Sequence, residues 1–308
     1  MKKISLGAWR KFHTCPRMYK YHYIDKLRPE VMGSSLYFGV AMDEALNHLL
    51  AGGKRTIEVF KESFEFDDVE HAEFGKYDID RRLLTTKQLQ ALEGEPENKV
   101  AWACLRVKGR MLLEEYQRTI LPKIERVYEI QRELPDRPGF IDVIAEIEGE
   151  GKVLLDHKTS SRAYAEDAAQ NDAQLARYAA SMGIDKIGFI VLVKNIDVKR
   201  RKTCTECGNV NTSTNHTTCD KVYNGTRCGG KWLVDYDAYP MVQLIIDDVP
   251  DYFQNEVVKD FKETEQMIDD GQFPRIINAC NKYYGKQCPY YNYCWNGKKD
   301  GLIKKEDS

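Results

Sequence analysis

Two short β-rich runs joined by a tight turn constrain the fold of this chain more than any other feature. Phe140 to Ile147 and Val153 to His157 are separated by the sequence EGEG, which is typical of a hairpin turn. Side chains alternate between the two faces of a strand, and a register slip of one residue would exchange the faces. If the apolar faces of both strands meet the core, Asp142, Asp156 and Lys158 must project together from the opposite face.

This group of two carboxylates and one lysine is suited to metal-dependent hydrolysis. Neighbouring carboxylates repel each other unless a cation lies between them, and hard oxygen ligands suit Mg²⁺ or Mn²⁺. A lysine beside them can orient the attacking water and offset developing negative charge. The pattern therefore indicates hydrolysis of phosphodiester bonds. The alternative is a solvent-exposed hairpin end held by an ion pair.

The remaining pattern predicts a mixed α/β core in which helices pack on a sheet. Apolar runs predict further strands at 187–193 and 239–246. Apolar spacing near the helical period predicts helices at 39–50, 100–116, 163–182 and 249–268.

Composition limits the classes of protein to which the chain can belong. It has 308 residues, of which 42% are hydrophobic, enough to bury a sizeable core. No apolar run approaches the roughly 20 residues that span a bilayer, and no signal-peptide core follows Met1. We therefore expect a cytoplasmic protein with no membrane partner. The net charge of −2 argues against a protein that is basic overall, although local basic stretches can still bind a polyanion.

Four motifs in a fixed order resemble the PD-(D/E)XK nuclease superfamily, in the branch of the RecB-type nucleases and the CRISPR-associated exonucleases. They are CPRMY at 15–19, GVAMDEAL at 39–46, GFID at 139–142 followed by DHK at 156–158, and QLARY at 174–178. The resemblance implies a restriction-endonuclease-like mixed sheet flanked by helices. It also implies a metal-dependent DNA exonuclease.

The resemblance assigns roles to the residues of the hairpin. It implies that Asp142, Asp156 and the backbone carbonyl of His157 hold Mg²⁺ or Mn²⁺. It implies that Lys158 positions the attacking water.

The two helical motifs carry the other implied site residues. Asp43 stands where the family has a metal-binding histidine; it can complete the ligand set, with Glu44 as a rival and a plain surface acid as the alternative. Gln174 and Tyr178 are four residues apart, so they share one helical face. The resemblance implies that both contact the substrate near the scissile phosphate, unless they only pack and cap.

One cysteine near the start of the chain and three near its end resemble a cluster-binding set. In the iron–sulfur members of this family, one early and three late cysteines hold a [4Fe-4S] cluster, and Cys15, Cys280, Cys288 and Cys294 match that arrangement. Four thiolates are what such a cluster requires. Zinc at the same thiolates and free thiols are the alternatives.

A second set of cysteines predicts structural zinc. Cys204 and Cys207 form a C-x2-C pair, and Cys219 and Cys228 follow with a less regular spacing, so His216 could replace one of them. The surrounding segment is polar and has little to bury, which means that it needs a metal to fold. We expect a zinc-ribbon-like insertion between two strands of the core.

Basic residues beside the two cysteine sets are the candidates for nucleic-acid contact. They are Arg17, Lys199, Arg200, Arg201 and Lys202. A purely structural zinc loop and a protein-docking element remain alternatives for the insertion.

These predictions combine into a domain plan and a function. The plan is an N-terminal helical region at 1–135, a nuclease core at 136–198 and 236–296, a zinc-binding insertion at 199–235, an iron–sulfur segment at 275–296 and a polar tail at 297–308. The expected function is a DNA exonuclease on single-stranded ends, in replication, recombination or repair. An endonuclease or flap-type nuclease, and a catalytically silent subunit that binds DNA or a partner, are the alternatives. Digestion polarity and protein partners do not follow from the residues.

Overall fold

A six-stranded mixed sheet forms the centre of the computed structural model, which describes residues 2–211, 217–281 and 287–305. The strand order is β2-β3-β4-β5, with β9 and the short β6 also paired to β5. β4 and β5 run parallel, and the other pairs are antiparallel. The strands are β2 (Ile124–Glu133), β3 (Phe140–Ile147), β4 (Gly151–Ser160), β5 (Lys186–Cys204), β6 (Val210–Asn211) and β9 (Trp232–Asp248).

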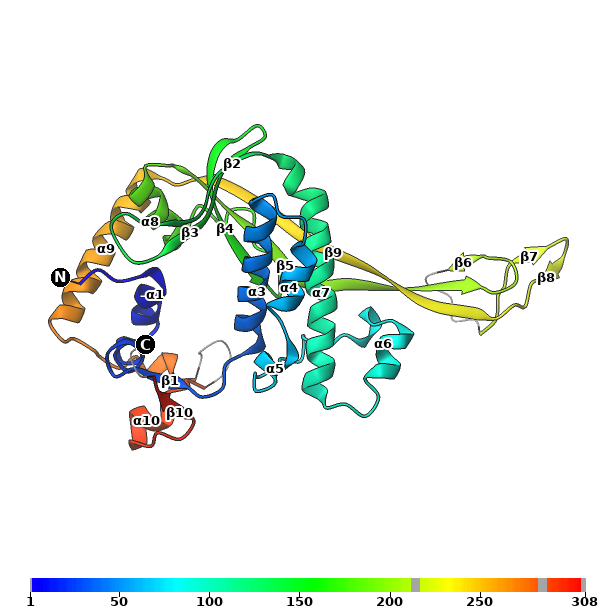
Figure 1. The fold of residues 1–308 in the computed structure, drawn as a ribbon, viewed down its shortest axis with the longest axis horizontal. Coiled ribbons are helices and arrows are strands. Elements are labelled where there is room, and N and C mark those ends of the chain that lie inside the picture. Colours follow the sequence, from blue (N-terminus) through cyan, green and yellow to red (C-terminus); the bar gives the residue numbers. More distant parts are fainter. Residues whose placement is uncertain (1, 212–216, 282–286, 306–308) are drawn as a thin grey trace.

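Helices cover both faces of this sheet (Figure 1). One face packs against α1 (Leu6–Thr14), α8 (Ala173–Met182) and α9 (Asp251–Asp269). The other packs against α3 (Ser34–Leu50), α4 (Thr56–Glu62) and α7 (Glu97–Thr119). The mixed α/β architecture expected from the sequence is confirmed.

The register of β3 and β4 confirms the predicted parity of the hairpin. Val143 pairs with Leu155 and Ala145 pairs with Val153, so odd residues face odd residues. Because helices cover both faces, the even-numbered Leu154 is buried as well. The β3–β4 ladder ends at Val143, so the two strands part just before the acidic residues of the site.

Two elements differ from the sequence expectations. The predicted helix at 163–182 begins only at Ala173, because Asp172 caps it by accepting hydrogen bonds from the backbone N–H groups of Gln174 and Leu175 at 2.8 and 3.0 Å. β2 was not expected. It is an edge strand rich in charged residues, and it begins at Ile124, so the sheet includes residues before the core boundary expected at 136.

A long two-stranded arm leaves the sheet. β5 and β9 run far beyond the predicted strands at 187–193 and 239–246, with a register irregularity between Val193 and Asp197 where the arm begins. The pairing continues to Cys204 opposite Trp232, and Figure 1 shows the arm projecting away from the helices. Its end carries the small hairpin of β7 (Val222–Tyr223) and β8 (Thr226–Arg227).

Segments from the two ends of the sequence form a small separate unit. β1 (Leu27–Pro29) pairs with β10 (Leu302–Lys304). The other elements of this unit are α2 (Pro16–Tyr19), a π-helix (Lys20–Ile24), a 3-10 turn (Ile277–Ala279) and α10 (Tyr291–Asn296). Its core contains Cys15, Met18 and Tyr290.

The remaining short elements lie between α4 and β2. They are α5 (Phe66–Val69), α6 (Thr86–Ala91) and 3-10 turns at Arg81–Leu83 and Leu121–Lys123. No helix in the part of the chain that the structure describes has the length and apolar character needed to span a membrane.

Candidate functional site

Helix α3 brings Asp43 to the point where β3 and β4 part. One side of α3 is buried through Phe38, Met42 and Leu46, which leaves Asp43 half-buried at the edge of the core. Its carboxylate is held by two amides: Asn47 Nδ2 donates at 3.0 Å, and Gln131 Nε2 donates to both oxygens at 3.3 and 3.1 Å.

Asp43, Asp142 and His157 come together as a candidate metal group. One ligand atom of each lies within 4.8 Å of the others. Asp142 also accepts a hydrogen bond from the backbone N–H of His157 at 2.7 Å, which ties the ends of β3 and β4 together. Glu44, the rival for the position of Asp43, is exposed and does not belong to this group of described residues.

The side chain of His157 belongs to the same group as the two carboxylates. The metal-binding role expected for its backbone carbonyl stays a prediction. The Nε2 atom of His157 lies 3.2 Å from the hydroxyl of Tyr116. Its buried Nδ1 atom has no hydrogen-bond partner among the described residues. Burial, followed by the nearby Lys158 ammonium, lowers the pKa of His157 to about 3, so the ring stays neutral. A neutral, unsatisfied imidazole nitrogen beside two carboxylates fits a divalent cation.

The shifted pKa values of the carboxylates also fit a site for a divalent cation. Burial, followed by the neighbouring Asp156, raises the pKa of Asp142 to about 8. Burial also raises the pKa values of Asp43 and Asp156. Acids that desolvation and mutual repulsion keep protonated ionise when a cation binds between them.

Asp156 belongs to a second network beside the metal group. It forms an ion pair with Lys158 and accepts a hydrogen bond from Gln174 Nε2 at 2.7 Å. The same amide nitrogen donates to the hydroxyl of Tyr178 at 2.7 Å, and Lys158 Nζ donates to Gln174 Oε1 at 3.3 Å. Among the described residues, the compact metal group does not include Asp156.

One open cleft of about 440 Å³ contains both networks. Its lining includes Ser35, Leu36, Val40, Asp43, Asp142, Asp156, His157, Lys158, Thr159 and Gln174. Tyr178 is only 4% exposed, and it lies behind Gln174 rather than among the described lining residues. Tyr178 therefore lies beneath the cleft, where it contacts Gln174.

Two supporting residues escaped the sequence analysis. Gln131 lies on β2, which was not predicted, and it adopts the left-handed conformation with φ of 51°. Such a conformation is unusual for a non-glycine residue and is often found at functional sites. Tyr116 is near the end of a predicted helix, but nothing in the sequence indicated that it would meet His157.

The comparison with protein families decides the identity of this fold. A model described as "PD-(D/E)XK nuclease superfamily" matches residues 3–295. The chain belongs to the PD-(D/E)XK nuclease superfamily. The resemblance noted in the sequence is thereby confirmed at the level of the superfamily, and so is the restriction-endonuclease-like mixed sheet. No curated protein matches the chain.

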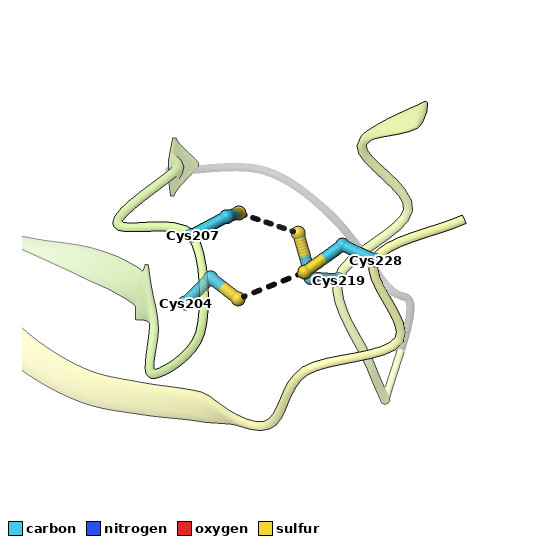
Figure 2. A group of neighbouring side chains, drawn as sticks. All are labelled: Cys204, Cys207, Cys219 and Cys228. Carbon is cyan, nitrogen blue, oxygen red and sulfur yellow. Dashed lines mark hydrogen bonds between the residues drawn. The ribbon is translucent and has the colours of Figure 1, made fainter. Parts of the chain in front are cut away.

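This PD-(D/E)XK chain carries a four-cysteine group at the end of its arm. Figure 2 shows Cys204 and Cys207 facing Cys219 and Cys228. The Sγ atoms of Cys204 and Cys228 are 3.6 Å apart, and those of Cys207 and Cys219 are 3.7 Å apart. Tetrahedral zinc with bonds of about 2.3 Å separates its sulfur ligands by roughly 3.8 Å, so the group has the right size. His216, the possible substitute ligand, lies outside the described residues.

Local backbone geometry supports this group. A hydrogen bond from the backbone of Asn209 lowers the pKa of Cys207 to about 7, which favours the thiolate that zinc requires. A Cβ atom at Gly230 would lie 2.7 Å from the Cys204 Sγ atom, so a glycine is needed there.

Four of the five remaining cysteines line a small cavity formed by segments from both ends of the sequence. Cys15 and Cys280 are buried, Cys288 and Cys294 are half-buried, and all four line the same cavity. Burial raises the pKa of Cys288 to about 11, with the three neighbouring thiols acting in the same direction and a hydrogen bond from the Tyr290 backbone opposing the shift. Unlike the arm cysteines, they do not form one of the compact groups with ligand atoms within 4.8 Å, as far as the described residues go. In a cluster each thiolate binds a different iron atom, so its sulfur ligands lie farther apart than those of a single zinc ion.

The basic residues of the arm are partly offset by acids. Arg201 pairs with Asp235 and Asp237 at 3.2 and 3.5 Å. Lys199 lies 3.7 Å from Asp197. The two other basic residues of this stretch differ in exposure, since Arg200 is exposed and Lys202 is only 8% exposed.

Arg17 lies at the cysteine cavity rather than on the arm. Its Nε atom donates to the backbone carbonyl of Phe273 at 2.9 Å. Contact of Arg17 and of the arm residues with nucleic acid stays a prediction.

Proposed function

We propose that this protein is a divalent-metal-dependent deoxyribonuclease that acts as an exonuclease on single-stranded ends. The observation that carries the proposal is the cleft in which Asp43, Asp142 and His157 converge beside Lys158. Acidic and imidazole ligands with an adjacent ammonium group suit the hydrolysis of a phosphodiester. Replication, recombination or repair is the proposed setting, and the cytoplasm is the proposed location.

Each residue has a distinct part in the proposed mechanism. Asp43, Asp142 and His157 would hold Mg²⁺ or Mn²⁺, with Asp156 available at the same end of the cleft. The bound cation would polarise the scissile phosphate and offset its charge. Lys158 orients the attacking water through its ammonium group.

Gln174 and Tyr178 act behind this centre. Gln174 holds both Asp156 and Lys158, and Tyr178 fixes the Gln174 amide. Gln174 also lines the cleft, so it can contact the substrate, as the sequence predicted.

Two further metal centres belong to the proposal. Zn²⁺ at the four arm cysteines is supported by sulfur separations that suit a tetrahedral ion. A [4Fe-4S] cluster at the four cavity cysteines is supported by their shared, partly buried position. The zinc would fold the arm tip, and the cluster would join the two ends of the chain.

Lys158→Ala provides the test of the proposed chemistry. We expect at least a 100-fold lower rate of cleavage of a labelled single-stranded oligonucleotide, with DNA binding nearly unchanged, because the ammonium group acts on the reacting atoms. Lys152→Ala is the matched control, since Lys152 is an exposed lysine at the other end of β4. Turnover by Lys158→Ala at the wild-type rate would remove the lysine from the mechanism.

The same assay separates the alternatives. Cleavage should require Mn²⁺ or Mg²⁺ and stop with EDTA, and blocked ends should prevent it. Cleavage of end-blocked or circular DNA would favour an endonuclease or flap-type nuclease on the same core. A wild-type protein that binds DNA but is inert with every divalent metal would favour a silent binding subunit.

A further inference from the structure

Two exposed aliphatic side chains line the wall of the cleft that holds the candidate metal group. Leu36 and Val40 are each 53% exposed, and both line the same cleft as Asp43. Residues three and four apart share one face of a helix, so these three side chains form a stripe along α3. The stripe is apolar at its start and ends at the metal group.

The position of this pair separates it from ordinary surface residues. A single exposed leucine or valine needs no explanation. Here two of them are continuous with a wall that bears Asp142, Asp156 and Lys158. Leu36 and Asp43 are about 10 Å apart along the helix axis, which is seven residues at about 1.5 Å each. A ligand that reaches both ends of the stripe must therefore carry an anionic group for the metal group and an apolar surface about 10 Å away from it.

Unpaired nucleotides have this combination of groups. Each one carries a phosphate and, beside it, a base whose flat face is apolar and can pack against aromatic or aliphatic side chains. In a duplex, the neighbouring base pairs cover those faces. An apolar contact of this kind would distinguish single strands from duplexes without reading sequence.

We propose that Leu36 and Val40 form a contact surface for unpaired bases next to the scissile phosphate, so that the cleft selects single-stranded ends. This inference rests on the proposed nuclease function and adds the residues that set its substrate class. The same side chains could instead act as a wedge that opens duplex ends, and the experiment below distinguishes that outcome.

The test compares two double variants of the full chain. Leu36→Ser with Val40→Ser removes the stripe. Leu233→Ser with Val210→Ser removes the same residue types from the arm, where they are 63% and 56% exposed. All four side chains are at the surface, so both proteins should keep the wild-type melting temperature.

Three probes are used with Mn²⁺. They are a labelled oligothymidylate, the same oligomer with abasic residues at the cleaved end, and methyl 4-nitrophenyl phosphate, which has no base. For the stripe variant, KM for the oligothymidylate should rise about tenfold with kcat within about twofold. Abasic residues at the cleaved end should raise the KM of the wild type by a similar factor. They should raise the KM of the stripe variant little further, because the substitution and the abasic residues remove the same contact. Hydrolysis of methyl 4-nitrophenyl phosphate should not change.

The results that would overturn the inference differ from those that would overturn the function. The inference alone would be overturned if the stripe variant were active and its KM for the oligothymidylate equalled that of the wild type or of the arm control. A blunt duplex is assayed in parallel as a further probe, and a larger loss on this duplex than on the single strand would replace the inference with the wedge. A wild-type protein that hydrolyses none of the three probes would overturn the proposed function and this inference with it.

Discussion

Two side-chain amides orient Asp43 at the metal group. Gln131 reaches it from an edge strand, and Asn47 reaches it from the next turn of α3. Asp43 stands where the resemblance implies a histidine, while His157 brings a ring nitrogen from β4 to the same group. With a carboxylate on α3 and an imidazole on β4, the proposed metal centre would still have one nitrogen ligand.

Gln131→Gly tests the role of the amide that orients Asp43. Glycine tolerates the φ of 51°, so the variant should fold at least as well as the wild type. Loss of the two hydrogen bonds to Asp43 should raise the Kd for Mn²⁺ about tenfold, measured by titration calorimetry. Gln170→Gly, at an exposed position in the loop before α8, serves as the control. An unchanged Kd in Gln131→Gly would show that Asp43 does not need this support.

The raised pKa of Asp142 predicts how the stability of the metal-free protein depends on pH. The folded protein keeps this proton up to about pH 8, whereas the unfolded chain loses it near the ordinary value of 3.8. Between these pH values the folded state binds more protons, so this group lowers the free energy of unfolding as pH rises, by at most about 1.4 kcal/mol per pH unit.

Asp142→Asn removes this titration and should flatten the corresponding part of the curve. Urea unfolding at pH 5 and pH 8, in the presence of a chelator, measures the difference between the two proteins. Equal pH dependence of wild type and Asp142→Asn would contradict the assignment.

At the scale of elements, the arm tip has little packing to hold it, so we expect its fold to depend on the proposed zinc. The strands of the arm are exposed along much of β9, and the buried residues at its tip include Cys204 and Cys219. The two main hydrophobic cores contain no described residue from 199 to 235. We therefore expect the arm tip to unfold independently of the sheet.

Replacing Cys219 and Cys228 with serine should release one zinc ion per chain. Hydrogen exchange should then become fast near the tip, while the protection of β3 and β4 should not change. Hydrolysis of methyl 4-nitrophenyl phosphate should also be retained. Val222→Ala, an exposed change in the same hairpin, should keep the zinc. Loss of protection throughout the sheet would show that the arm and core fold as one unit.

At the scale of the whole molecule, the chain closes on itself through its cysteine cavity. Cys15 follows α1, and the other three cysteines follow α9, so the cavity joins elements from both ends of the sequence. The same unit is closed by the pairing of β1 with β10. A cluster there would stabilise the chain against separation of its ends.

Cys15→Ser should remove this link. The wild-type protein, purified without oxygen, should be brown and contain about four iron atoms per chain. The variant should be colourless and melt roughly 5 °C lower or more, because a group that binds only the folded state stabilises it. Cys104→Ala removes a cysteine buried in a different core and should keep the colour. A colourless wild-type protein with two zinc ions would contradict the cluster.

The chemistry of the hairpin and the arm could be predicted because it depends on local rules. The alternation of side chains predicted the odd-with-odd pairing of the hairpin, and the observed register up to Val143 and Leu155 agrees with it. Beyond that point Asp142 joins His157 in the metal group, whereas Asp156 and Lys158 lie in the neighbouring network. The C-x2-C spacing of Cys204 and Cys207 indicated a pair of metal ligands in the same way. Neither deduction needed contacts between distant elements.

The partners of these residues required the tertiary structure. Asp43 and His157 are more than a hundred residues apart, and they meet because α3 packs on the sheet beside β4. Gln131 comes from a strand whose charged pattern resembles a surface loop, and only its pairing with β3 makes it part of the sheet. The sequence by itself determined that odd residues pair with odd residues in the hairpin, because that follows from a two-residue period. Only the packing of helices on the sheet decided which nitrogen, amide and aliphatic groups surround the acids and the lysine, because no local period relates distant segments.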